Sequence, residues 1–288
     1  LWAVPEESPG FERATSVARS GADSTGPRRT GVYSSQVEEG WDILGNANGG
    51  YMLASVARAC VAELERPDPV SVTAHFLSPG RPGPTSIEVD VQREGRRFSV
   101  ASARLLDSEG RQLLNTLGAF ADLSDSTGPL QIDAEPPDLP APDGCVGAPP
   151  PPESTDADLA TAGPSFMNRV DLRLHPDDAG FREGRPSGRA RVRGWFGFPD
   201  GSAIDTIGLL CVLDAFPPTV FNSDLPVAWV PTLEFTAHIR CRPAPGWLAC
   251  EFTTRVVSSG FLEEDGLVWD SEGKLVAQSR QLALVPRG

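Results

Sequence analysis

Two apolar segments of helical length occur along the chain, one in each half. The first covers residues 49–64 and follows Asn46 and Asn48, either of which can cap a helix. The second covers residues 203–216 and is stopped by Pro217 and the proline after it. Both segments are apolar on nearly every side, which predicts two helices buried at the centre of the fold.

Runs rich in Val, Phe, Thr and Leu, separated by turn residues, follow each predicted helix. A helix followed by an antiparallel meander is typical of an α+β unit in which the sheet wraps around the helix. The predicted strands cover residues 86–92, 98–106, 112–120, 249–257, 267–269 and 275–284.

The two halves of the chain resemble each other at a fixed offset of 163 residues. Thr73-Ala74-His75 matches Thr236-Ala237-His238, and eleven identities occur without a gap over the 38 residues from 73 to 110. A fixed register of this kind indicates an internal duplication. Between the halves, a proline-rich stretch predicts an extended, semi-rigid linker. We therefore divide the chain into a first unit (1–124), a linker (125–164) and a second unit (165–288).

Composition limits the possible partners. The 25 Lys and Arg residues are outnumbered by 39 Asp and Glu residues, and the net charge of −14 argues against a nucleic-acid partner, which needs a basic surface. We see no run of ~18 apolar residues and no signal-peptide pattern, so we expect no membrane partner. The five cysteines form no CxxC motif, which predicts neither disulfides nor a zinc site. We expect a cytoplasmic protein without metal or cofactor.

Three polar side chains of the second half are candidates for chemistry. Asp214 lies on an apolar stripe near the end of the second predicted helix, where burial and the helix dipole both oppose its charge. Thr232 begins a strand-like run, and Gln281 lies in the last predicted strand. An acid, a hydroxyl and an amide could together hold and activate one water molecule.

Four short motifs occur in the same order over about 240 residues: Asn48–Tyr51, His75–Gly80, Arg93–Ser99 and Asp270–Ala277. Together they resemble the acyl-CoA thioesterase II family, the double hot-dog thioesterases. The resemblance implies an α+β double hot-dog fold, in which two tandem antiparallel sheets are each wrapped around a long central helix. It also implies hydrolysis of an acyl-CoA or a related acyl thioester.

The resemblance assigns roles to specific residues. The resemblance implies that water is activated by an Asp, a Thr or Ser, and a Gln. In this sequence these correspond to Asp214, Thr232 and Gln281. At the start of the first helix, backbone amides are implied to face the carbonyl oxygen of the thioester and to stabilise the oxyanion. The residues at that position are Gly49, Gly50 and Tyr51.

Binding of coenzyme A, which carries several negative charges, requires local cations. Three arginines lie together in one predicted turn, and two more are two positions apart on one strand, where they share a face. The candidates are Arg93, Arg96, Arg97, Arg240 and Arg242.

Other readings remain open from the sequence. A hydratase or dehydratase acting on acyl thioesters would depend on His75 or His238. These two histidines occupy equivalent positions in the two halves, which favours a structural role for both. A non-catalytic module that binds acyl thioesters is a second alternative, and a carrier-protein thioester could replace coenzyme A. Sheet edges also leave room for a homo-oligomer.

Overall fold

The computed structural model of the chain describes residues 10–21, 29–125, 131–147 and 165–286. Within these ranges most strands belong to one large antiparallel sheet, and helices are few. The α-helices are α1 (Phe11–Ala14), α2 (Gly49–Leu64) and α3 (Gly208–Val212). The strands are β1 (Ala18–Gly21), β2 (Thr30–Val37), β3 (Asp42–Ile43), β4 (Asn46–Ala47), β5 (Asp68–Phe76), β6 (Gly83–Arg93), β7 (Ser99–Asp107), β8 (Gln112–Ala121), β9 (Val146–Gly147), β10 (Asp171–Leu174), β11 (Arg191–Gly197), β12 (Thr232–Ile239), β13 (Leu248–Thr253), β14 (Val257–Ser258), β15 (Phe261–Trp269) and β16 (Leu275–Leu284). The short 3-10 helices are η1 (Leu123–Asp125), η2 (Pro142–Gly144), η3 (Ser165–Asn168), η4 (Pro176–Asp178), η5 (Gly180–Glu183) and η6 (Thr219–Asn222).

The long helix α2 is confirmed with the bounds that the sequence predicts. Asn48 is its N-cap, and the side-chain Oδ1 accepts a hydrogen bond of 2.8 Å from the backbone amide of Tyr51. At the other end the backbone turns into the left-handed region at Glu65, with φ 53°. Most side chains of the helix are buried, as its apolar composition predicts.

The prediction of a second long helix is wrong. Only α3, with five residues, is helical in the segment 203–216. The carboxylate of Asp205 accepts a hydrogen bond from the amide of Gly208, so the helix starts at Gly208 and not at residue 203. Proline disfavours a helical conformation at the residue before it, and the chain leaves the helix ahead of Pro217.

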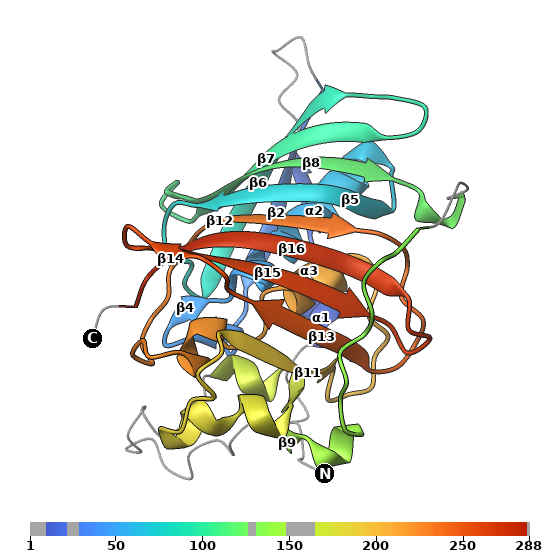
Figure 1. Cartoon of the computed structure of the whole chain (residues 1–288). Helices are drawn as coiled ribbons and strands as arrows, with labels where there is room; N and C mark the ends of the chain where they lie inside the picture. Colours follow the sequence, from blue (N-terminus) through green and yellow to red (C-terminus); the bar gives the residue numbers. More distant parts are fainter. Residues whose placement is uncertain (1–9, 22–28, 126–130, 148–164, 287–288) are drawn as a thin grey trace.

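One continuous sheet replaces the two tandem sheets that the sequence predicts. Its strand order is β1-β2-β6-β7-β8-β5-β12-β16-β15-β13-β11-β10-β9, so β5 and β12 join the two halves. Figure 1 shows these two strands side by side at the junction. Thr73 lies directly opposite Thr236, and their hydroxyl oxygens are 2.9 Å apart. The offset of 163 residues equates these two threonines, so this is the arrangement that a duplicated unit predicts.

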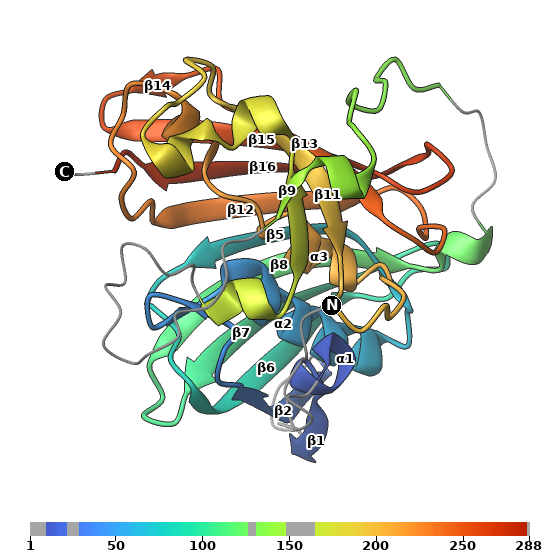
Figure 2. The same ribbon diagram turned by 90° about the horizontal axis from the view of Figure 1, so that it is seen from below.

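The two faces of the sheet differ in polarity. Val72, Ala74, Phe235 and Ala237 are buried and belong to the main core, together with residues of α2 and α3. Figure 2 shows α2 and α3 close together, with strands of both halves around them. Among the described residues, no helix combines the length and the apolar character that a membrane crossing requires.

Residues 131–147, the longer of the described parts of the predicted linker, are packed against the second half. Trp195 Nε1 donates a hydrogen bond of 2.8 Å to the carbonyl oxygen of Pro140. Ala134 and Leu139 pack against a small core cluster that contains Trp269. The segment ends in β9, which pairs with β10. We call residues 131–147 the strap, because they pack against the sheet of the second half.

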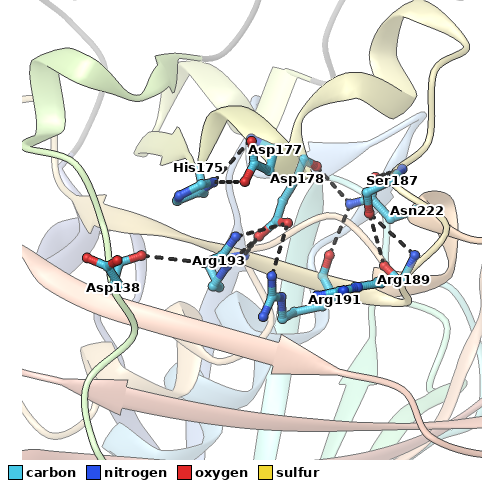
Figure 3. A network of polar contacts seen from close by, with 9 residues as sticks. All are labelled: Asp138, His175, Asp177, Asp178, Ser187, Arg189, Arg191, Arg193 and Asn222. Carbon is cyan, nitrogen blue, oxygen red and sulfur yellow. Dashed lines mark hydrogen bonds and ion pairs between the residues drawn. The ribbon is translucent and has the colours of Figure 1, made fainter.

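A buried carboxylate fixes the segment that follows the linker (Figure 3). Asp178 is 2% exposed and accepts hydrogen bonds from the backbone amide and the guanidinium of Arg193 on β11. Arg193 also reaches the carbonyl oxygen of Asp138 in the strap, at 3.4 Å. Asn222 Nδ2 donates to the carbonyl oxygens of Asp178 and Arg191. Removal of the carboxylate would leave a buried arginine without its partner.

Candidate active site

The start of α2 and the end of α3 meet at close range. A side-chain carbon at Gly50 would lie 2.5 Å from the carbonyl oxygen of Leu210, and one at Gly49 would lie 2.9 Å from Asp214 Oδ2. Neither distance is compatible with a methyl group. The two glycines therefore let the acid and the helix that carries it approach the first turn of α2.

Asp214 is held at the N-terminal end of α2. Its Oδ2 accepts hydrogen bonds of 2.7 Å from the amide of Gly50 and 3.2 Å from Asn48 Nδ2. Asn48 Nδ2 also donates to the backbone oxygen of Asp214, at 2.8 Å. The sequence placed this acid at the unfavourable end of its own helix. The structure adds the favourable, positive end of α2 beside it.

The environment of Asp214 sets its acidity. Burial raises the pKa of its carboxyl group to about 6, while the amides of Gly50 and Gly49 and the side chain of Asn48 act in the opposite direction. As a residue, Asp214 is half-buried. Its carboxylate accepts protons more readily than that of an ordinary aspartate, which suits a general base.

Thr232 and Gln281 are brought together by neighbouring strands. An irregularity in the pairing of β12 with β16 follows Thr232, so its side chain lies on the inner side of the sheet. Gln281 lies opposite the buried Phe235 and also faces inward. Thr232 Oγ1 donates a hydrogen bond of 3.0 Å to Gln281 Oε1. The predicted hydroxyl and amide are thus in direct contact.

Glu264 on β15 is a site residue that the sequence analysis missed. It lies opposite Gln281 and is 4% exposed. Gln281 Nε2 donates to its Oε1 at 2.9 Å, and the amide of Thr219 donates to its Oε2 at 2.8 Å. The sequence gives only a weak signal for it, because residue 264 shares a strand face with Leu262 and Val268 while apolar residues also lie on the other face.

Electrostatics link the two parts of the site. The pKa of Glu264 is raised to about 7, mainly by burial; the charge of Asp214 acts in the same direction, and the hydrogen bonds from Thr219 and Gln281 act against it. Such an effect requires the two carboxyl groups to lie near each other inside the protein. Asp214, which follows α3 and is held at the start of α2, is therefore near Glu264, the last member of the chain Thr232, Gln281 and Glu264.

The three residues expected around the oxyanion are engaged within the protein. The amide of Gly50 donates to Asp214, and the amide of Tyr51 donates to Asn48 Oδ1. The ring of Tyr51 stacks on Trp41 with a centroid distance of 4.8 Å, and its hydroxyl donates to the carbonyl oxygen of Ala14. In this structure Gly49 and Gly50 hold the acid, and Tyr51 belongs to the core.

The structure does not bring the candidate arginines to the acid. The turn with Arg93, Arg96 and Arg97 lies at the far end of α2, where Arg29 bridges Glu63 and Glu94. A helix of this length spans about 24 Å, which separates the turn from Asp214.

The other two arginines lie beyond the far end of β12. Arg240 is about 25 Å along the strand from Thr232, given ~3.3 Å per residue. Arg242 is bonded to Asp68 at 2.8 Å and to Asp122 at 3.2 Å. It therefore joins the two halves.

The histidines of the hydratase alternative lie away from the site. His75 and His238 are exposed, and each follows a buried alanine that faces the core, so they point to the outer face of the sheet. Among the described residues, no three His, Cys, Asp or Glu side chains are grouped in a way that could hold a metal ion.

Known proteins resemble this chain over nearly its whole length. A structure from Thermobifida fusca, provisionally assigned as a thioesterase II, has a TM-score of 0.82 and 32% sequence identity, covering 96% of this chain and 97% of that one. A hot-dog protein of unknown function from Alicyclobacillus acidocaldarius has a TM-score of 0.78 and 20% identity, covering 96% and 98%. An uncharacterised protein of Mycobacterium tuberculosis (strain ATCC 25618 / H37Rv) is 32% identical over 88% of this chain and 91% of its own length.

Family models match both halves of the chain. The acyl-CoA thioesterase N-terminal domain matches residues 37–122, and the acyl-CoA thioesterase C-terminal domain matches residues 142–285. The hot-dog fold of the structural neighbour agrees with the large antiparallel sheet and the few helices described above. The chain therefore belongs to the acyl-CoA thioesterase family.

Proposed function

We propose that this protein hydrolyses acyl-CoA, or a related acyl thioester, to the free acid and the thiol by direct attack of an activated water molecule. The observation that carries the proposal is the state of Asp214. It is a half-buried acid of raised pKa, held by the start of α2, and its charge acts on Glu264, which accepts a hydrogen bond from Gln281. The family match supports the same class of reaction.

In the first step, Asp214 acts as the general base. Water gives one proton to its carboxylate while the water oxygen forms a bond to the thioester carbon. Negative charge then leaves Asp214 and appears on the carbonyl oxygen. Because both positions lie near the N-terminal end of α2, its dipole stabilises the carboxylate before the transfer and the oxyanion after it. Thr232 and Gln281 orient the water.

In the second step, the tetrahedral intermediate collapses. The carbon–sulfur bond breaks, the electron pair goes to sulfur, and the proton held by Asp214 moves to the leaving thiolate. One water molecule is consumed, one acid and one thiol are formed, and Asp214 is ionised again. No covalent bond to the protein forms at any point.

The test is release of free thiol from a panel of acyl-CoAs that covers short, long and aromatic acyl groups. Wild type is compared with Asp214→Asn, and Asp224→Asn is the matched control, because it removes the same charge from an exposed loop. We expect turnover that falls by about 10²–10⁴-fold in Asp214→Asn and is unchanged in the control.

Two results would contradict the proposal. Binding of acyl-CoA without release of thiol by wild type would favour a non-catalytic module. Full turnover by a folded Asp214→Asn variant would keep the hydrolysis and remove Asp214 as its base.

A further inference from the structure

Glu264 is a buried acid that the proposed mechanism does not use. Both of its oxygens have partners in the protein, since Oε1 accepts from Gln281 Nε2 and Oε2 accepts from the amide of Thr219. A carboxyl group with only 4% exposure is costly to bury, even when it is hydrogen-bonded. Its place beside Gln281 therefore needs an explanation.

A carboxylate decides which way round the neighbouring amide lies. An ionised carboxylate only accepts hydrogen bonds, so Glu264 must face the NH₂ group of Gln281. The carbonyl oxygen of Gln281 then faces Thr232, and the hydroxyl of Thr232 must donate to it. Glu264, by accepting through Oε1, thus sets the direction of both hydrogen bonds, from Gln281 to Glu264 and from Thr232 to Gln281.

We propose that Glu264 is a positioning residue that turns the hydroxyl proton of Thr232 toward Gln281 and leaves the lone pairs of Thr232 Oγ1 for the attacking water. This inference rests on the proposed thioester hydrolysis. The water would donate one hydrogen to Asp214 and the other to Thr232. Its own lone pair would then remain available for the thioester carbon.

The opposite direction would weaken the nucleophile. If the Gln281 amide were reversed, its NH₂ group would donate to Thr232, and the hydroxyl proton of Thr232 would point toward the water. That proton would bind one of the two lone pairs of the water oxygen and make the water a weaker nucleophile. The hydrogen-bonded pairs at the site would be almost unchanged, and only the rate of attack by water would fall.

The orientation of the Gln281 amide is the same whether Glu264 is ionised or protonated. The side chain of Thr219 is also hydrogen-bonded to this carboxyl group. A proton on Oε2 can therefore point to the hydroxyl of Thr219, while Oε1 still accepts from Gln281. Protonation in this form leaves the amide of Gln281 in the same orientation.

Glu264→Gln tests the inference with hardly any change of shape. The amide of Thr219 is a backbone donor and cannot turn, so the introduced side-chain oxygen must face it. The introduced NH₂ group then faces Gln281 and reverses its amide. We expect kcat for acyl-CoA hydrolysis to fall at least about tenfold while KM stays within about twofold of wild type.

Glu263→Gln is the matched control. Glu263 is the preceding residue on β15, on the other face, and its Oε1 accepts from the backbone amides of Arg255 and Val256. A glutamine oxygen can accept the same two bonds, so we expect wild-type kcat and KM. Thermal unfolding of both variants shows whether either has lost the fold.

A second measurement does not need turnover. The proton and nitrogen shifts of the Gln281 side-chain amide, assigned with Gln281→Glu, report whether it donates to a carboxylate. We expect these shifts to change in Glu264→Gln and to stay in Glu263→Gln. A folded Glu264→Gln variant with wild-type kcat, or with an unchanged amide shift, would overturn the inference. If wild type releases no thiol, the proposed hydrolysis fails, and the amide shift alone decides whether Glu264 directs these hydrogen bonds.

Discussion

Asp214→Asn should stabilise the protein while it abolishes activity. The pKa of Asp214 rises from its ordinary value of 3.8 to about 6 because the carboxyl group is buried. The folded protein therefore binds this proton more tightly than the unfolded chain does, and ionisation costs stability. Each pKa unit corresponds to about 1.4 kcal/mol, which gives about 3 kcal/mol for the ionised group. Since the side chain is only half-buried, we expect about 2 kcal/mol.

The dependence on pH distinguishes this effect from a simple change of packing. Far below the unfolded pKa of 3.8, Asp214 is protonated in both states and costs nothing. As pH rises, the cost appears between about pH 4 and pH 7 and then stays constant. Asparagine has no charge and avoids it. The free energy of unfolding of the variant should therefore exceed that of wild type, by a margin that grows with pH over this range.

Urea unfolding of wild type, Asp214→Asn and the exposed control Asp224→Asn, from about pH 4 to pH 8, measures the margin. A difference between wild type and Asp214→Asn that does not vary with pH would refute the reasoning. So would a wild type that is more stable than Asp214→Asn at the highest pH. The first result would mean that the pKa of Asp214 is not raised in the folded protein. The second would mean that the hydrogen bonds to the carboxylate outweigh the cost of its burial. In either case its role as a base of raised pKa would lose its support.

Two further predictions follow from the same structure. The value of kcat/KM for acyl-CoA hydrolysis should rise with pH and level off above a midpoint near 6, because Asp214 must be ionised to accept the proton of water. A pH–rate profile checks this. Asp178→Ala should lower the free energy of unfolding by about 3–5 kcal/mol, since the buried Arg193 loses its partner; urea unfolding against wild type measures the loss, and a change below about 1 kcal/mol would contradict it.

Local signals in the sequence predicted the parts of the fold that local contacts determine. Helix α2 has its cap, Asn48, and its apolar face within one segment, so its bounds follow from the sequence alone. The prediction of a second long helix was wrong although its determinants are local as well. The start depends on how Asp205 binds the amide of Gly208, and the end depends on the prolines beyond it. Hydrophobicity alone could not show where the chain stops being helical.

The candidate site was predictable in its residue types and less so in its geometry. Thr232 and Gln281 are in contact, as the resemblance implied, because their strands are neighbours. The candidate arginines lie far from Asp214, and their role in binding coenzyme A stays a prediction, since closeness in sequence does not say which end of a helix a turn occupies. Glu264 was missed because its role depends on Gln281, the residue opposite it in the next strand. Which residues pair between strands is a property of the folded sheet.

The offset between the halves explains why the proposed chemistry has candidate residues in one half and not in the other. Two units related by a two-fold arrangement provide two equivalent positions for a site. The residues that correspond to Thr232, Gln281 and Glu264 in the first half are Pro69, Gly118 and Ala101. None of these carries a polar side chain, and a methyl group at Gly118 would lie 2.8 Å from the ring of Phe120, so aromatic packing fills that position. A duplicated chain can change one copy without changing the other. Only the second half therefore presents a hydroxyl, an amide and a carboxyl group in line, while the first half supplies the glycines and the helix end that hold the acid.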